Sequence, residues 1–168
     1  MSTHTTTSVY TRTHTAVYLT EAILSTITGI LAQLDIDASR LLRDWEQDSK
    51  AISAWITEGS LAMVIVECTR PDGTVNPVFE FPVTYTSGRE GDAQFVTSQA
   101  AIARYRAKFA TTPRGTTFRL FCTFCTARTP QPGWSEGTRA SIDGLRSTSF
   151  GTVAEGPHAR ASGRYLSS

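Results

Sequence analysis

The chain has 168 residues, 40% of them apolar, with 16 lysines and arginines against 15 aspartates and glutamates. This length suits one compact domain, and a formal charge of +1 excludes a strongly basic nucleic-acid-binding surface. The longest apolar run, residues 61–66, is far below the roughly 20 residues that span a bilayer, and the N-terminal residues lack a secretory signal pattern. Three cysteines, an odd number, favour free thiols and with them a cytoplasmic protein. Together with the short apolar runs and the balanced charge, this leads us to expect neither membrane contact nor direct nucleic-acid binding.

The first part of the chain has the spacing of helices. Residues 1–13 are mostly Thr and Ser, too polar to bury as a unit, and are predicted to form a mobile N-terminal arm. Apolar positions at helical spacing predict a first helix over 16–34, with Thr13 or Thr15 as its N-cap. A second helix is predicted to begin at Asp37 and to end at Gly59.

Strand patterns follow Gly59. Residues 61–68 and 78–85 flank a Pro-Asp-Gly turn and predict a β-hairpin, in which Pro82 favours an edge or bulged position for the second strand. A third helix is predicted on the stripe Ser98, Ile102, Tyr105 and Phe109, with Thr97 or Ser98 as its N-cap. Residues 116–126 form the clearest strand, whose alternation separates Phe118, Leu120, Cys122 and Phe124 from Arg119, Phe121, Thr123 and Cys125.

The last 41 residues differ from the rest of the chain. They hold six of the twelve glycines and eleven serines or threonines, so they carry few large apolar groups. Residues 158–165 nevertheless alternate like a half-solvated strand. A weakly anchored segment with strand capacity can occupy more than one position on a sheet.

No catalytic or metal-binding motif is found in the sequence. Cys122 and Cys125 have CxxC spacing, but a strand sends them to opposite faces, and no second cysteine pair or nearby histidine completes a zinc site. Asp44, Glu46 and Asp48 stand among basic residues, which is typical of a solvated helix face. We therefore expect a protein that is not an enzyme and has no cofactor or metal.

The order of arm, two helices, hairpin, helix, long strand and strand-forming tail is similar to that of a HORMA domain. The resemblance is carried by residues 13–24, by Asp44-Trp45 with 51–61, by Gly133-Trp134-Ser135, by 141–153 and by Gly163-Arg164-Tyr165. The chain most resembles the small single-domain bacterial HORMA proteins, family 1 type, that are encoded with cGAS-like nucleotidyltransferases in CBASS antiphage systems. The resemblance implies an α+β fold with three helices on a small antiparallel sheet and a mobile C-terminal safety belt.

The resemblance also implies a binding switch without catalysis. In the family, the belt moves from one sheet edge to the other and traps a short peptide, and the closed form binds and activates the nucleotidyltransferase. An AAA+ remodelling ATPase reverses closure by engaging the N-terminal arm. The bound peptide would come from another protein or from an N-terminal arm.

Carried onto this chain, the resemblance divides a single domain into an arm (1–13), a core (14–127) and a safety belt (128–168), with residues 78–85 as the edge that receives the belt. Within the strand over 116–126, it assigns peptide binding to Thr117, Arg119, Leu120, Phe121, Cys122, Thr123, Phe124 and Cys125. The assigned belt residues are Trp134, Leu145, Ser147, Ser149, Phe150, Gly151, Val153 and Tyr165. The remodeller would engage Ser8, Val9, Tyr10, Thr11 and Arg12.

Two questions stay open on the sequence. The first is whether the protein is, instead of a peptide switch, a small α+β enzyme or metabolite-binding domain. Its pocket between sheet and helices would then be lined by Trp45, Trp55, Phe118 and Phe124. The second concerns Arg119, which either favours acidic peptides or is an ordinary solvated strand residue.

Overall fold

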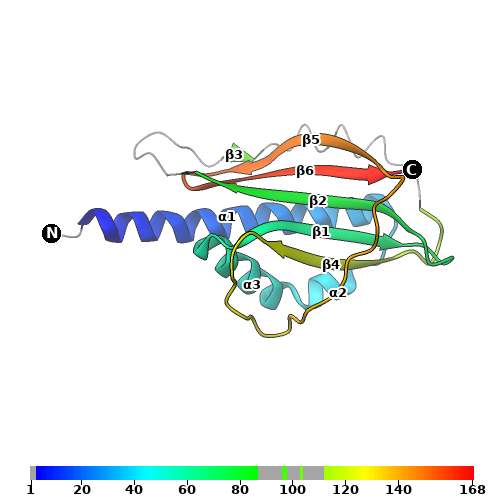
Figure 1. Cartoon of the computed structure of the whole chain (residues 1–168), viewed down its shortest axis with the longest axis horizontal. Helices are drawn as coiled ribbons and strands as arrows, with labels where there is room; N and C mark the ends of the chain where they lie inside the picture. The colour runs from blue at the N-terminus through cyan, green and yellow to red at the C-terminus, as the bar shows by residue number, and fades with distance from the viewer. Residues whose placement is uncertain (1–2, 87–95, 98–102, 104–111) are drawn as a thin grey trace.

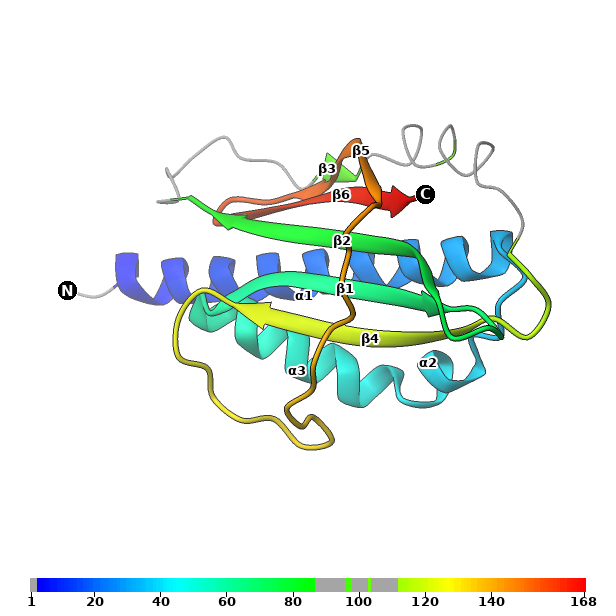
Figure 2. The ribbon, with the colours of Figure 1, turned by 45° about the vertical axis from the view of Figure 1, so that its right-hand side comes forward.

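The computed structural model describes residues 3–86, 96–97, 103 and 112–168, which form an α+β domain (Figures 1 and 2). The described helices are α1 (Thr3–Gln33), α2 (Ser39–Arg43) and α3 (Trp45–Glu58). They lie against one face of an antiparallel sheet of order β3-β5-β6-β2-β1-β4. Its strands are β1 (Leu61–Thr69), β2 (Val75–Tyr85), β3 (Val96–Thr97), β4 (Thr117–Phe124), β5 (Arg146–Glu155) and β6 (Ala159–Ser167). The predicted fold class is confirmed.

Helix α1 begins at Thr3, so the expected start near Ala16 is wrong and neither Thr13 nor Thr15 caps it. Residues 3–13, expected as an extended arm, continue the helix, because adding turns to an existing helix costs far less than nucleating one. Residues Thr11–Gln33 are long and apolar enough to cross a membrane by length and composition alone. Most of their apolar side chains are buried in the core of this domain, among them Ala16, Leu19, Ile23, Ile27 and Ile30, whereas Val17 is 48% exposed; a core helix passes the same test.

The expected second helix is divided into α2 and α3, which meet at Asp44. Helix α2 begins at Ser39 with Ala38 as its N-cap, so the helix does not start from Asp37 as predicted, although Asp37 accepts a hydrogen bond from the Ser39 N–H at 2.9 Å. Helix α3 ends at Gly59, whose φ of 78° is the left-handed conformation that stops helices. The predicted stop at Gly59 is therefore correct.

Strand β2 pairs with β1 on one side and with β6 on the other. The expectation that Pro82 marks an edge strand is wrong, because this strand lies inside the sheet. The paired residues of β2 and β6 run through Glu80↔Arg164 and resume at Val83↔Ala161, which omits Phe81 and Pro82. A missing ladder bond at that gap explains how an internal strand accommodates a proline.

Apolar side chains cover both faces of the sheet. The main core lies between sheet and helices and includes Phe118, Leu120, Cys122 and Phe124 of β4 at its margin. Phe121, from the other side of β4, joins a smaller cluster around Ile65, Val78 and Leu166. The alternation expected of this strand is therefore observed.

Residues 96–97 form a short strand paired with β5 at Ala154 and Glu155. Of the helix predicted from Ser98 to Phe109, residue 103 is described and is helical; the remaining positions lie outside the described residues.

The C-terminal segment, residues 128–168, runs from the end of β4 past α3 and across the sheet to β5 (Figure 1). Its two strands pair with each other, and β6 pairs with β2. Ile142 and Leu145 pack on the cluster around Ile65, so the crossing lies on the face opposite the helices. We call this segment the belt.

Candidate functional site

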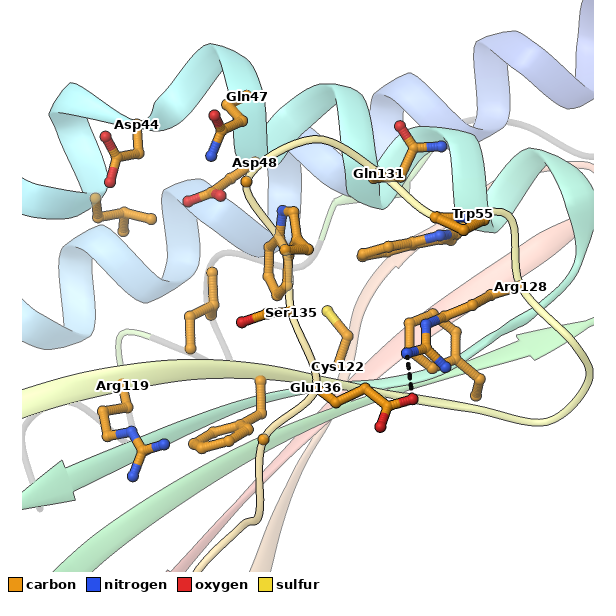
Figure 3. Close-up of a pocket in the computed structure, with 18 of the residues that line it drawn as sticks. Asp44, Gln47, Asp48, Trp55, Arg119, Cys122, Arg128, Gln131, Ser135 and Glu136 are labelled. Atoms are coloured by element: carbon orange, nitrogen blue, oxygen red, sulfur yellow. Dashed lines mark ion pairs between the residues drawn. The ribbon is translucent and has the colours of Figure 1, made fainter.

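Strand β4 ends the sheet, and among the described residues it pairs only with β1. A cavity of about 960 Å³ lies beside it, between β4, helices α2 and α3, Ala127 and belt residues 128–137 (Figure 3). Five of the eight predicted peptide-binding residues line it: Arg119, Leu120, Phe121, Cys122 and Phe124. Thr117, Thr123 and Cys125 are not part of the lining. A strand with an open edge next to a cavity has main-chain groups ready to pair with another extended chain.

The first part of the belt is fixed to α3. The Trp55 indole Nε1 donates to the Thr129 carbonyl at 2.7 Å, and Glu58 accepts bonds from the Thr129 N–H (3.0 Å) and Oγ1 (2.8 Å). Hydrogen bonds from Ser60 and then Thr129 lower the pKa of Glu58, so the charged carboxylate is the form that holds the belt. The Trp134 ring packs edge-on against Trp55 with centroids 5.3 Å apart. The belt therefore covers the cavity from the helix side.

Gly133 explains how closely the belt approaches α3. Its φ is 80°, and a Cβ at this position would overlap the side-chain amide of Gln47. The left-handed conformation favours glycine here, whereas the Gln47 amide is the far end of a flexible, exposed side chain.

The second part of the belt is fixed to the opposite face of the sheet by two buried carboxylates. Glu80 of β2 is 2% exposed and accepts hydrogen bonds from Arg164 Nε at 2.7 Å and Arg139 Nη2 at 3.0 Å. Glu67 of β1 is 1% exposed and accepts the Ala140 N–H at 2.7 Å. All three partners belong to the belt. Since a buried charge is costly without a partner, these carboxylates tie the sheet to the belt in this position.

The remaining predicted belt residues fall into two groups. Phe150 and Val153 are buried, and Phe150 packs edge-on against Phe81 over Gly163, where a Cβ would overlap the Phe150 ring. Tyr165 is half-buried against Phe79, and Leu145 joins the cluster on the outer face. Ser147 and Ser149 are exposed on β5, and Gly151 has a φ of 82° at an irregularity in its pairing with β6. The aromatic and aliphatic members anchor the belt.

The arm residues Ser8, Val9, Tyr10, Thr11 and Arg12 lie within α1. The prediction that a remodelling partner engages them is not tested by the fold.

Asp48 is the cavity residue that the sequence interpretation placed wrongly on a solvated face. It is half-buried in the cavity lining, beside Asp44. Burial first, and then the Asp44 charge, raise the pKa of Asp48 to about 6, while Arg40 opposes the rise. No local pattern could have revealed this, because the burial comes from groups distant in sequence.

The cavity offers binding groups rather than a reactive centre. The Arg119 guanidinium lies over the Phe121 ring at 4.6 Å, and Arg128 lies over Phe124 at 4.5 Å while pairing with Glu136 at 3.7 Å (Figure 3). Burial raises the pKa of the Cys122 thiol far above neutral, which keeps it protonated and poorly nucleophilic. Within the described residues, no group of His, Cys, Asp or Glu is arranged to hold a metal ion. Trp55, Phe118 and Phe124 line the cavity as the metabolite-pocket alternative requires, but Trp45 does not.

Helices on one face of an antiparallel sheet, with a C-terminal segment carried across the other face, define a HORMA-like domain. A chain of the mitotic checkpoint complex has the same fold, with a TM-score of 0.72 and 12% identity over 90% of this chain and 97% of that one. C. elegans HTP-2 bound to the HIM-3 closure motif has a TM-score of 0.66 and 14% sequence identity, over 89% of this chain and 88% of HTP-2. A chain of the E. coli MS115-1 CdnC:HORMA-deltaN complex has a TM-score of 0.52 and 12% sequence identity, over 92% of this chain and 88% of that chain.

The protein belongs to the family described as Bacterial HORMA domain 2, whose sequence model matches residues 4–168. The predicted membership of the bacterial HORMA domains is thereby confirmed, although the match does not establish the family 1 type. A search of curated proteins gave no match.

Proposed function

We propose that this protein is a non-catalytic peptide-binding switch. The observation that carries the proposal is the open edge of β4 beside a cavity that the belt covers. An extended peptide added to this edge gains main-chain hydrogen bonds, while the cavity receives its alternate side chains. The fold shared with HTP-2, which is bound to a closure motif, supports the same use of the fold here.

The belt would hold such a peptide by enclosing it. It is fixed to α3 through Thr129 and Trp134 and to the sheet through Arg139, Ala140 and Arg164. The first attachments lie beside the cavity on α3 and the others lie on the opposite face of the sheet, so the belt passes around the edge of β4 and would enclose a chain lying between β4 and α3. Release would then require part of the belt to detach, which makes the complex slow to dissociate.

In this proposal, the peptide comes from another protein and the closed form activates a cGAS-like nucleotidyltransferase of an antiphage CBASS system in the cytoplasm. Membership of a bacterial HORMA family and the shared fold with a chain of the CdnC:HORMA-deltaN complex support this partner. An AAA+ ATPase would reset the switch by engaging residues 1–13.

The test is peptide capture by the full-length protein. Chain purified from cells should retain peptides that mass spectrometry identifies after denaturation, and Trp134→Ala should retain at least about tenfold less because the belt loses its aromatic contact with α3. Leu42→Ala, at a side chain 57% exposed and outside the cavity lining, is the matched control and should behave as wild type.

Absence of peptide from the wild-type protein, or equal retention by Trp134→Ala, would contradict the proposal. A bound metabolite in place of peptide would instead favour the alternative, a ligand pocket lined by Trp55, Phe118 and Phe124.

A further inference from the structure

Asp48 is a carboxylate without a bonded partner. It stands in the first turn of α3, half-buried, and no hydrogen bond or ion pair joins it to any residue that the structure describes. Figure 3 shows Asp44 and Asp48 projecting from the helix toward the space in front of β4. The cavity lining is mixed: it includes polar groups and also apolar side chains, among them Leu41, Phe118 and Leu120.

The cations around the cavity do not neutralise this group. From β4, Arg119 is placed over Phe121; from the belt, Arg128 pairs with Glu136. From the helical side, Arg43 pairs with Asp44 at 3.3 Å, and exposed Arg40 acts on Asp48 only through space. Burial and the like charge of Asp44 together favour its protonated form and raise its pKa to about 6. The ionised carboxylate of Asp48 therefore destabilises the protein while no cation faces it, and ionisable groups in such unfavourable surroundings are typically found at functional sites.

A second group in the cavity also lacks its partner. The indole Nε1 of Trp134 is buried and has no hydrogen-bond acceptor among the described residues. Buried donors are nearly always satisfied, so an acceptor for this group would require the Trp134 ring or its surroundings to shift, as enclosure of a peptide would do.

We infer that the groove selects a peptide that places a lysine or arginine side chain against Asp48; this rests on the proposed peptide-binding function. Alternate residues of a strand paired with β4 face the helices, as Phe118, Leu120 and Cys122 themselves do. A basic side chain suits that position, because its aliphatic stem packs on the apolar side chains of the lining while its charged end meets Asp48. The aromatic rings of Trp55 and Trp134 in the same lining favour a cation as well.

An acidic side chain would face both Asp44 and Asp48 on this side of the strand. The sequence-based idea that Arg119 favours acidic peptides therefore does not extend to the helix-facing positions. Arg119 is adjacent to Phe121 and belongs to the other face of β4.

Selection from a phage library of random 12-residue peptides by the full-length protein tests the inference. Wild type should enrich Lys or Arg over Asp or Glu about tenfold at one fixed position, the preference expected of a charge-assisted hydrogen bond. Asp48→Asn, nearly equal in shape, should lose most of that enrichment, and Asp48→Lys should reverse it. Glu46→Gln removes an exposed acid from the same helix turn outside the cavity and should leave the preference unchanged.

Two results would overturn the inference separately from the function. Strong peptide enrichment without a basic position, or a basic position unchanged in Asp48→Asn, refutes the role of Asp48 while leaving peptide binding intact. Failure of the wild type to enrich any peptide refutes the peptide-binding function itself. Circular dichroism of each variant confirms that the comparison is between folded proteins.

Discussion

Replacing Glu80 by Gln should detach the belt from the sheet more readily without changing the core. The Glu80 side chain is 3% exposed and holds both Arg139 and Arg164, whose side chains are 28% and 40% exposed. Removing one partner of a buried ion pair costs about 3–5 kcal/mol when the remaining charge stays buried. Because both arginines recover part of their hydration and Gln keeps one acceptor oxygen, we expect a loss of about 2 kcal/mol.

Hydrogen exchange measured by strand gives the test. A loss of about 2 kcal/mol corresponds to roughly 30-fold faster exchange of β5 and β6 amides, with a much smaller change in α1. The matched control is Arg43→Gln, which breaks the exposed pair with Asp44 (71% and 36% exposed) and should change stability by less than about 1 kcal/mol. Exchange in β6 within twofold of wild type, or an equal increase in α1, would refute the assignment of Glu80 to belt attachment.

Three further changes test other parts of the domain. Gly163→Ala should lower the free energy of unfolding by about 1–3 kcal/mol in a denaturant titration, because the new Cβ overlaps the Phe150 ring; an unchanged midpoint would show that the ring moves freely. Asp48→Asn should stabilise the protein at pH 7 but not below pH 3.8. Folding raises the pKa of Asp48 from 3.8 to about 6, so protonated Asp48 favours the folded state below pH 3.8, and this contribution to stability is lost as the pH rises through 6. Without solvent screening, this pKa shift corresponds to about 3 kcal/mol of stability, and the half-exposed position of Asp48 reduces the expected gain to about 1 kcal/mol. Equal gains in stability in urea titrations at pH 3 and pH 7 would contradict this prediction. Peptide binding should shift tryptophan emission. Trp134→Phe should reduce the shift, with Trp55 in the same lining giving the remainder, whereas Trp45→Phe, outside the cavity, should leave it unchanged.

Local patterns predicted those parts of the fold that local forces determine. The alternation over residues 117–124 fixed which side chains of β4 face the helices, since a strand places alternate residues on opposite faces. Gly59 ended α3 as expected, because the left-handed conformation favours glycine. The strand-forming capacity of the C-terminal segment was predicted from its alternation, whereas its assignment as a belt came from the family resemblance.

Contacts between distant segments could not be predicted in the same way. Glu67 and Glu80 are charged residues in apolar strands, and only their contacts with residues 139, 140 and 164 explain their burial. Pro82 indicated an edge because it removes one donor, but the sheet continues past it by leaving a gap in the ladder to β6. The prediction that Asp48 is solvated was wrong for the same reason, because the surface that buries it is built from segments far away in the chain.

The position of the belt also predicts how a peptide exchanges. In this structure the belt pairs with β2 and is held there through Glu67 and Glu80, while among the described residues the outer edge of β4 has no strand partner. If a peptide enters and leaves only when part of the belt detaches, weakening these attachments accelerates both steps by the same factor and leaves the equilibrium affinity nearly unchanged. Glu80→Gln should therefore raise association and dissociation rates together for a fluorescent peptide obtained from the library selection, measured by stopped flow. A faster dissociation with an unchanged association rate would instead mean that Glu80 stabilises only the peptide-bound form.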